Sequence, residues 1–120
     1  MKKILVVDDD AVVQKLLGET LERKGYKVTI AKDGIDAMIL VRKDRPDLVV
    51  LDIMMPNLNG YEVCRKIKQD KVLKSIPIIL LTSRGQEVDP RLLELMGIEY
   101  LHKTAKPQEL LDMLEKSVGH

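Results

Sequence analysis

The sequence has few aromatic residues and almost no excess of charge of either sign. It contains three Tyr, no Trp and no Phe, so it offers few of the aromatic side chains on which proteins stack the bases of single-stranded nucleic acids. Twenty Lys and Arg residues face nineteen Asp and Glu residues, which gives a formal net charge of +1. A chain so balanced has no basic excess to attract a phosphate backbone. Direct binding of nucleic acid is therefore not expected.

Cysteine and long apolar segments are also scarce. Cys64 is the only cysteine, so the chain can form neither an internal disulfide nor a cysteine-based metal cluster, as expected in a reducing compartment. We expect Cys64 to be a small core residue rather than a reactive thiol, because free cysteines are often buried. The apolar run 4–7 is too short for a signal-peptide core or a membrane span. The sequence predicts a cytosolic protein that does not insert into membranes.

Short apolar segments alternate five times with longer segments of helical periodicity. Segments 4–7, 48–51 and 78–81 are apolar throughout, which is typical of strands buried on both faces of a parallel sheet. Segment 27–31 and the weaker segment 98–101 complete the expected strands. Apolar stripes at helical spacing lie at Val13, Leu16, Leu17 and Leu21; at Ala37, Met38 and Val41; at Val63, Cys64 and Ile67; at Leu92, Leu95 and Met96; and at Leu110, Leu111 and Leu114.

The length and the order of these segments predict the fold. With 120 residues, 45% of them hydrophobic, the chain has room for one packed domain. Right-handed crossovers between five strand–helix units favour an open parallel sheet of order 2-1-3-4-5 with helices on both faces. We predict a single doubly wound α/β domain over residues 1–120, with no output domain. Ligands of such sheets bind beyond the carboxyl ends of the strands, where the connections reverse direction between strands one and three.

Acidic residues follow the two strands on either side of this reversal point. Asp8, Asp9 and Asp10 follow segment 4–7, and Asp52 follows segment 48–51. Two unit charges about 4 Å apart repel by roughly 4 kcal/mol at an effective dielectric constant near 20, so a bound cation or protonation must offset the repulsion. We favour Mg²⁺, which binds carboxylate oxygens, keeps several waters and bridges readily to phosphate.

Each acid also has a simpler interpretation. Asp10 stands where a helix N-cap is expected, and we favour capping over metal binding for this residue. Asp8 or Asp9 alone could equally be a capping or solvated residue. Asp52 is poorly placed as a surface charge, because it ends a run of apolar residues. The metal prediction therefore rests on the combination of acids.

Two further polar residues are expected at the same edge of the sheet. Thr82 follows segment 78–81, and Lys103 comes shortly after segment 98–101. A hydroxyl and an ammonium beside a Mg²⁺-bound carboxylate can hold a phosphoryl group. Asp52 would then be the nucleophile, since aspartyl phosphate is a recognised covalent species and its formation needs mainly positioning and charge neutralisation. Taken alone, Lys103 would be read as a solvated surface lysine.

These residues occur in an order that resembles the receiver domain of bacterial two-component response regulators. The resemblance covers essentially the whole chain, and it implies a CheY-like, flavodoxin-like (βα)5 fold and a phosphoacceptor rather than a conventional enzyme. Five elements in order make it highly specific. They are the pair Asp8-Asp9, segment 51–56 (Leu-Asp-Ile-Met-Met-Pro), Asn59-Gly60 after it, segment 81–83 (Leu-Thr-Ser), and Tyr100 three residues before Lys103.

The resemblance also implies a role for each site residue. A histidine kinase or a phosphotransfer protein would donate a phosphoryl group to Asp52, and Lys103 and Thr82 would contact that group. Thr82 would move toward the phosphate as Tyr100 turns inward, changing a surface that a downstream protein binds; Tyr100 could instead be a fixed core residue. The protein would be a monomer or a phosphorylation-dependent dimer. Mg²⁺ would be held by Asp8, Asp9, Asp52 and the backbone carbonyl of Met54.

The sequence departs from the family pattern in two places. Thr104 follows Lys103 where receivers usually have a proline, often after a cis peptide bond. Because a cis bond before a non-proline residue costs about 2.5 to 4 kcal/mol, we expect a trans bond and a slightly displaced Lys103. The interval from Thr82 to Lys103 is also one residue shorter than usual, and we place the deletion near Gly97.

Two alternative functions remain at this stage. The first is a receiver fold that works as an interaction module without phosphorylation, which the two departures permit. The second is an enzyme on a similar fold, either a flavin binder or an aspartate-based phosphatase. The flavin interpretation is disfavoured because three acids after the first strand would repel a phosphate group. The phosphatase interpretation requires a second acid two positions after the nucleophile, where this chain has Met54.

Overall fold

Five parallel strands form one sheet in the order β2-β1-β3-β4-β5, which confirms the predicted fold class. The computed structural model describes residues 1–53, 55, 58–83, 88–103 and 105–118. β3 and β4 are buried over their whole length, and β1 is buried after its first residue, as their apolar sequences predict. The strands are β1 (Lys3–Val7), β2 (Lys27–Ala31), β3 (Leu48–Asp52), β4 (Ile78–Thr82) and β5 (Ile98–His102).

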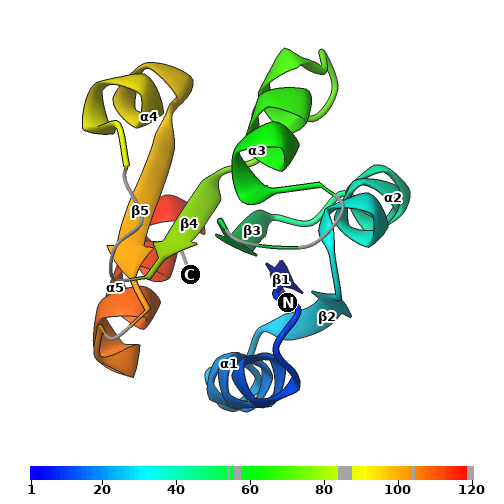
Figure 1. Cartoon of the computed structure of the whole chain (residues 1–120). Helices are drawn as coiled ribbons and strands as arrows, with labels where there is room; N and C mark the ends of the chain where they lie inside the picture. The colour runs from blue at the N-terminus through cyan, green and yellow to red at the C-terminus, as the bar shows by residue number, and fades with distance from the viewer. Residues whose placement is uncertain (54, 56–57, 84–87, 104, 119–120) are drawn as a thin grey trace.

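Helices cover both faces of the sheet and create two separate cores. α1 and α5 lie on one face, and α2, α3 and α4 lie on the other (Figure 1). Alternate residues of β1 serve the two cores: Leu5 and Val7 pack with α2 to α4, whereas Ile4 and Val6 pack with α1 and α5. The helices are α1 (Ala11–Arg23), α2 (Gly34–Asp44), α3 (Gly60–Gln69), α4 (Pro90–Met96) and α5 (Pro107–Val118).

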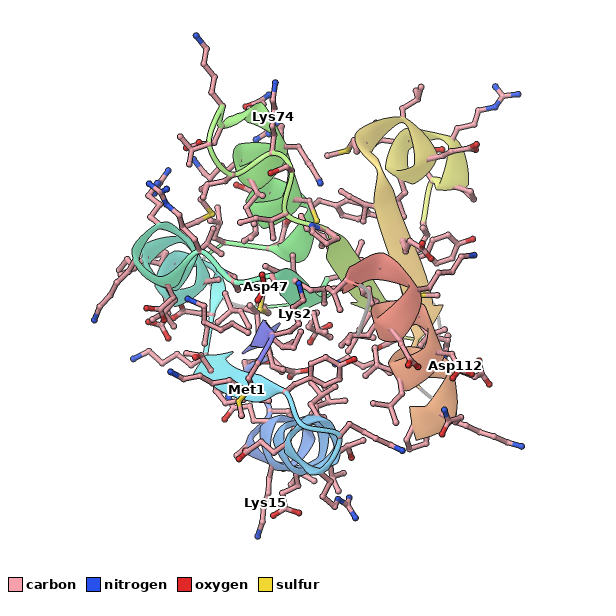
Figure 2. All side chains as sticks on the ribbon, turned by 180° about the vertical axis from the view of Figure 1, so that it is seen from behind. Met1, Lys2, Lys15, Asp47, Lys74 and Asp112 are labelled. Carbon is pink, nitrogen blue, oxygen red and sulfur yellow. The ribbon has the colours of Figure 1, made fainter. Side chains whose placement is uncertain are left out.

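Backbone and side-chain hydrogen bonds also join β1 to β3 at their amino ends. The backbone N–H of Lys3 donates to the Asp47 carboxylate at 2.7 Å, and the N–H of Asp47 donates to the Lys3 carbonyl at 2.8 Å. In the view of the molecule from behind in Figure 2, Asp47 and Lys2 are labelled near the centre of the picture. This pairing fixes the register of the two strands whose opposite ends form the site described below.

The ends of the helices follow the predicted signals. The carboxylate of Asp10 accepts hydrogen bonds from the backbone N–H groups of Val12 and Val13 at 2.8 and 3.4 Å, so its predicted role as an N-cap is confirmed. Gly25 follows α1 with a φ of 92°, a left-handed conformation that favours glycine. α4 ends at Gly97, with a φ of 70°, and β5 begins at the next residue. Gly97 alone separates α4 from β5, and the placement of the one-residue deletion near Gly97 stays a prediction.

Two of the predicted helical stripes are partly wrong. Leu16 on α1 is 60% exposed, so the core side of this helix is carried mainly by Leu21. On α4, Leu92 and Leu95 are 45% and 86% exposed, whereas Leu93, which the stripe omits, is buried. A helix of only seven residues contacts the sheet over less than two turns. Its register is therefore set by the buried Leu93 and the partly buried Met96, which packs against the same core.

No helix of the described residues is long and apolar enough to cross a membrane.

Cys64 lies in the interior of α3. The Cys64 side chain is buried in the core, as predicted, and forms no disulfide. Burial raises the pKa of its thiol to about 12, so the reactive thiolate form is disfavoured.

Candidate metal centre

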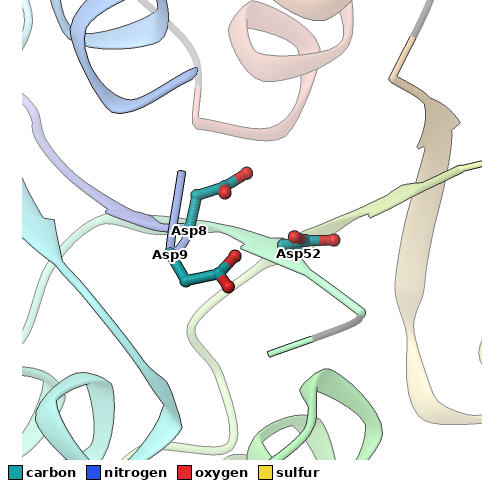
Figure 3. Close-up of side chains that lie close together, drawn as sticks. All are labelled: Asp8, Asp9 and Asp52. Atoms are coloured by element: carbon teal, nitrogen blue, oxygen red, sulfur yellow. The ribbon is translucent and has the colours of Figure 1, made fainter. Parts of the chain in front are cut away.

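Three carboxylates converge at the carboxyl edge of the sheet, from two neighbouring strands. β1 and β3 pair in parallel with Val7 opposite Leu51, so the acids that follow these residues must lie side by side. One oxygen each of Asp8, Asp9 and Asp52 lies within 4.8 Å of the other two. Figure 3 shows the three side chains lying close together, with Asp8 and Asp9 extending toward the side on which Asp52 lies. The structure therefore brings together the three acids that the sequence assigned to a metal.

The environments of the three acids differ. Asp8 is fully buried and Asp52 is 1% exposed, whereas Asp9 is exposed to solvent. Oδ1 of Asp8 accepts a hydrogen bond from the backbone N–H of Asp10 at 2.9 Å, but its Oδ2 is buried without any hydrogen-bond partner. Burial, aided by the nearby charge of Asp52, raises the pKa of Asp8 above its ordinary value. The site thus contains a buried carboxylate oxygen whose hydrogen-bonding capacity is not used.

These residues fit a hard divalent cation. Mg²⁺ prefers oxygen ligands and is commonly bound by one or two carboxylates together with water. Within the described residues, Oδ2 of Asp8 accepts no hydrogen bond and faces only the Lys103 ammonium, at 3.3 Å, so it can supply a ligand. The solvent-exposed Asp9 leaves one side of the site accessible to water. The predicted fourth ligand, the backbone carbonyl of Met54, lies outside the described residues.

Lys103 provides the positive charge that the site has within the described residues. Its ammonium nitrogen lies 2.8 Å from Oδ2 of Asp52 and 3.3 Å from Oδ2 of Asp8. Burial alone would lower the pKa of Lys103, but the hydrogen bond and charge of Asp52, together with Asp8, outweigh burial and raise it. The backbone N–H of Lys103 donates to the Thr82 carbonyl at 2.7 Å, which fixes the chain at the end of β5.

Lys103 contacts Asp52 although the proline usual in receivers is missing after it, and its slight displacement relative to other receivers stays a prediction. Its ammonium reaches Asp52 directly, at a normal hydrogen-bond distance. Thr104, on which that expectation rested, lies outside the described residues.

Thr82 and Tyr100 occupy different positions relative to the acids. Thr82 is the last residue of β4 and is 5% exposed; it lies one residue beyond Leu81, which pairs with Asp52. Tyr100 lies on the edge strand β5 and is 42% exposed, so the alternative of a fixed core residue is wrong. Neither position tests whether these side chains move.

Two contacts near the acids escaped the sequence analysis. Gln14 donates from Nε2 to the backbone carbonyl of Asp8 at 2.6 Å, and no local pattern predicts this contact six residues along the chain. Gly60 donates from its backbone N–H to the Ile53 carbonyl at 2.8 Å, and a Cβ on Gly60 would lie 2.5 Å from the Asp52 carbonyl oxygen. The Asn59-Gly60 pair predicts a helix start, but not that the start of α3 presses against the chain beside Asp52.

Comparison with known proteins gives one consistent result. The model of the response regulator receiver domain family matches residues 4–115. The chain is 44% identical over 110 residues to the alkaline phosphatase synthesis transcriptional regulatory protein PhoP of Bacillus subtilis, covering 91% of this chain and 45% of PhoP. It is 41% identical over 111 residues to the DNA-binding response regulator MtrA of Mycobacterium tuberculosis, covering 92% of this chain and 47% of MtrA. The chain thus spans about half the length of these relatives.

Solved structures give the same result for the fold. A putative response regulator from Chloroflexus aurantiacus has a TM-score of 0.90 and 31% identity, covering 99% of this chain and 98% of that one. The receiver domain of a sensor histidine kinase from Pseudomonas aeruginosa has a TM-score of 0.87 and 32% identity, with coverages of 99% and 98%. The latter was crystallised with a magnesium ion coordinated in its active-site cleft.

Proposed function

The chain belongs to the response regulator receiver domain family, and from this premise we propose that it accepts a phosphoryl group on Asp52 in a Mg²⁺-dependent reaction. The observation that carries the proposal is the convergence of Asp8, Asp9 and Asp52 within 4.8 Å, with the Lys103 ammonium on Asp52. The protein is a phosphoacceptor and not a conventional enzyme. Receiver domains interact with histidine kinases, so a phosphohistidine of such a kinase, or of a phosphotransfer protein, is the proposed donor.

The proposed transfer forms one bond and breaks one bond. A carboxylate oxygen of Asp52 attacks phosphorus, and the bond from phosphorus to the donor's imidazole nitrogen breaks, leaving that nitrogen with the electron pair. Bound Mg²⁺, held by Asp8, Asp9 and Asp52, would supply charge neutralisation for the phosphoryl oxygens. Lys103, whose ammonium contacts both Asp52 and Asp8, supplies a second cation, and the Thr82 hydroxyl donates a hydrogen bond to a phosphoryl oxygen.

Phosphorylation then changes the charge balance of the site. It adds about −1.5 to −2 charges beside Lys103 and Thr82. A two-state surface shifts only as far as this charge is bound better in one state than in the other. We propose Thr82 as the residue that senses the phosphate and Tyr100 as the one that turns inward in response. The half-exposed position of Tyr100 supports this role, because it leaves the side chain an inward movement to make.

The wider context of the chain belongs to the same proposal. We propose that residues 1–120 act as a stand-alone cytosolic receiver, as a monomer or as a dimer formed on phosphorylation, and that a downstream protein binds its switched surface. A comparison of proteins captured by beryllofluoride-treated and untreated protein would identify the downstream partner.

Acetyl phosphate tests the central step without a partner kinase. With Mg²⁺ present, we expect intact-mass measurement to detect a phosphate adduct on the wild-type chain and on Asp10→Asn, which removes a neighbouring acid that caps α1. Asp52→Asn is expected to abolish the adduct, and chelation of Mg²⁺ to suppress it. Undiminished labelling of Asp52→Asn would contradict the role of Asp52. A folded wild-type protein that binds Mg²⁺ but takes no phosphate would favour the phosphorylation-independent interaction module.

A further inference from the structure

An open groove runs between α3 and α4, away from the acidic site. Its volume of about 740 Å³ is within the range of sites that bind organic ligands. Four side chains give it an apolar lining: Tyr61 from α3, Val88 from the segment before α4, and Leu92 and Met96 from α4. Small-molecule pockets usually enclose most of their ligand. An open groove between two helices is better matched to a third helix lying along it.

The core uses only part of the apolar lining of the groove. Tyr61, Val88 and Met96 are partly buried and pack against the core beside the buried Leu93, whereas Leu92 is 45% exposed. Leu92 and Met96 are one turn apart on the same side of the helix, and both face the groove. A single exposed leucine needs no explanation, but a strip that continues to Tyr61 on the neighbouring helix is typical of an interaction surface.

The charged residues of the groove differ in whether they are already engaged. Asp89 caps α4 by accepting hydrogen bonds from two backbone N–H groups. Glu62 accepts a hydrogen bond from the Asn59 side chain, and the ammonium of Lys68 donates to two backbone carbonyls of the chain between α3 and β4. Arg65 differs, because it is exposed and its guanidinium makes no hydrogen bond or ion pair with the residues that the structure describes. The groove therefore offers a partner one uncommitted cation.

We infer that this groove binds an amphipathic helix of a partner protein, with apolar side chains seated among Tyr61, Leu92 and Met96 and a carboxylate paired with Arg65. A guanidinium holds a carboxylate through two parallel hydrogen bonds, so it can set the register of a helix whose apolar face supplies most of the contact. This surface lies outside the acidic site, and its use does not depend on phosphorylation of Asp52.

Selection from a displayed library of short helical peptides tests the inference on the whole chain. We expect the enriched peptides to share apolar residues at positions i, i+3 or i+4, and i+7, together with an acidic residue. Leu92→Lys and Arg65→Glu are each expected to weaken their binding by about tenfold or more. The matched controls Leu95→Lys and Arg91→Glu change exposed residues of α4 that do not line the groove, and they should leave the affinity unchanged.

A charge exchange completes the test. Replacing the acidic residue of a selected peptide with Lys should restore binding to Arg65→Glu and weaken binding to the wild type. Failure to enrich any peptide, or equal binding to the wild type, Leu92→Lys and Arg65→Glu, would overturn the inference. Labelling of Asp52 by acetyl phosphate is expected to be unchanged in both groove variants, so the outcome here is separable from that of the proposed phosphorylation.

Discussion

The ammonium nitrogen of Lys103 lies 2.8 Å from Oδ2 of Asp52, across 51 residues of sequence. The same nitrogen lies 3.3 Å from Oδ2 of Asp8, so one positive charge is shared between two buried carboxylates. With Asp9 nearby, the described part of the site has three negative charges to one positive charge. This imbalance of charge explains why the site should take up a cation, and the following predictions are based on it.

Mg²⁺ should stabilise the folded protein. A ligand at 100 times its dissociation constant adds about 2.7 kcal/mol to the free energy of unfolding, which for a domain of this size corresponds to a rise of roughly 10 °C in the melting temperature. Differential scanning calorimetry with Mg²⁺ and with a chelator measures this rise. Asp9→Ala should fold normally but need more Mg²⁺ for the same rise, whereas Asp10→Asn should match the wild type. An identical Mg²⁺ dependence of Asp9→Ala and wild type would remove Asp9 from the ligand set.

Asp8→Asn should raise the stability of the metal-free protein at neutral pH. Burial holds the pKa of Asp8 above its ordinary value, which means that its charged form is less favourable in the folded than in the unfolded state. Asn removes that charge with little change of shape, so we expect the free energy of unfolding to rise. Urea denaturation in a chelator measures it. The same variant should lose the stabilisation by Mg²⁺, and a variant that is less stable than wild type without metal would contradict this account.

As the pH is lowered, the affinity for Mg²⁺ should begin to fall at a higher pH than it would if all the ligands were aspartates of ordinary pKa. A raised pKa means that Asp8 takes up a proton before a solvated aspartate does as the pH is lowered, and that proton competes with the metal. Without metal, the pH dependence of stability runs in the opposite direction. The contribution of Asp8 to the free energy of unfolding is fully present below its pKa in the unfolded chain and is lost as the pH rises through its pKa in the folded protein. Melting curves from pH 4 to 8, with and without Mg²⁺, should therefore converge at low pH. Curves that stay equally separated would exclude Asp8 as the titrating ligand.

The sequence was sufficient to predict the sheet order and the meeting of Asp8 with Asp52, because both follow from apolar runs that end in acids on paired strands. It was not sufficient for α4, where Leu93 rather than Leu92 reaches the core. In a helix this short, the adjacent Leu92 and Leu93 leave the register undecided, and only the packing against the sheet selects one of them. Contacts between distant segments, such as Gln14 with the Asp8 carbonyl, leave no periodic signal in the sequence.

Lys103→Met should destabilise the metal-free protein and strengthen Mg²⁺ binding. Removing one partner of a fully buried ion pair costs about 3 to 5 kcal/mol. The Lys103 side chain is 25% exposed, and solvent screening reduces the expected loss to about 1 to 3 kcal/mol. The two carboxylates it leaves behind then attract a dication without a competing ammonium, so the melting temperature should respond to lower Mg²⁺ concentrations. Labelling by acetyl phosphate should fall at the same time, and weaker Mg²⁺ binding would show that Lys103 does not compete with the metal.

Gly60→Ala should destabilise the fold and damage the acidic site together. An added Cβ would lie 2.5 Å from the Asp52 carbonyl oxygen and 2.7 Å from the Ile53 Cα, and both are backbone atoms that cannot turn aside. Alanine normally stabilises a helix by about 0.5 to 1 kcal/mol relative to glycine, but overpacking here should cost about 1 to 3 kcal/mol and shift the chain that carries Asp52. Gly18→Ala is the matched control, since its added Cβ would meet its nearest neighbour at 3.9 Å in the interior of α1. In urea denaturation we expect Gly18→Ala to be slightly more stable than the wild type, and we expect it to bind Mg²⁺ normally. Gly60→Ala should lose both stability and Mg²⁺ affinity. Equal stability of the two variants would show that the start of α3 is free to move away from Asp52.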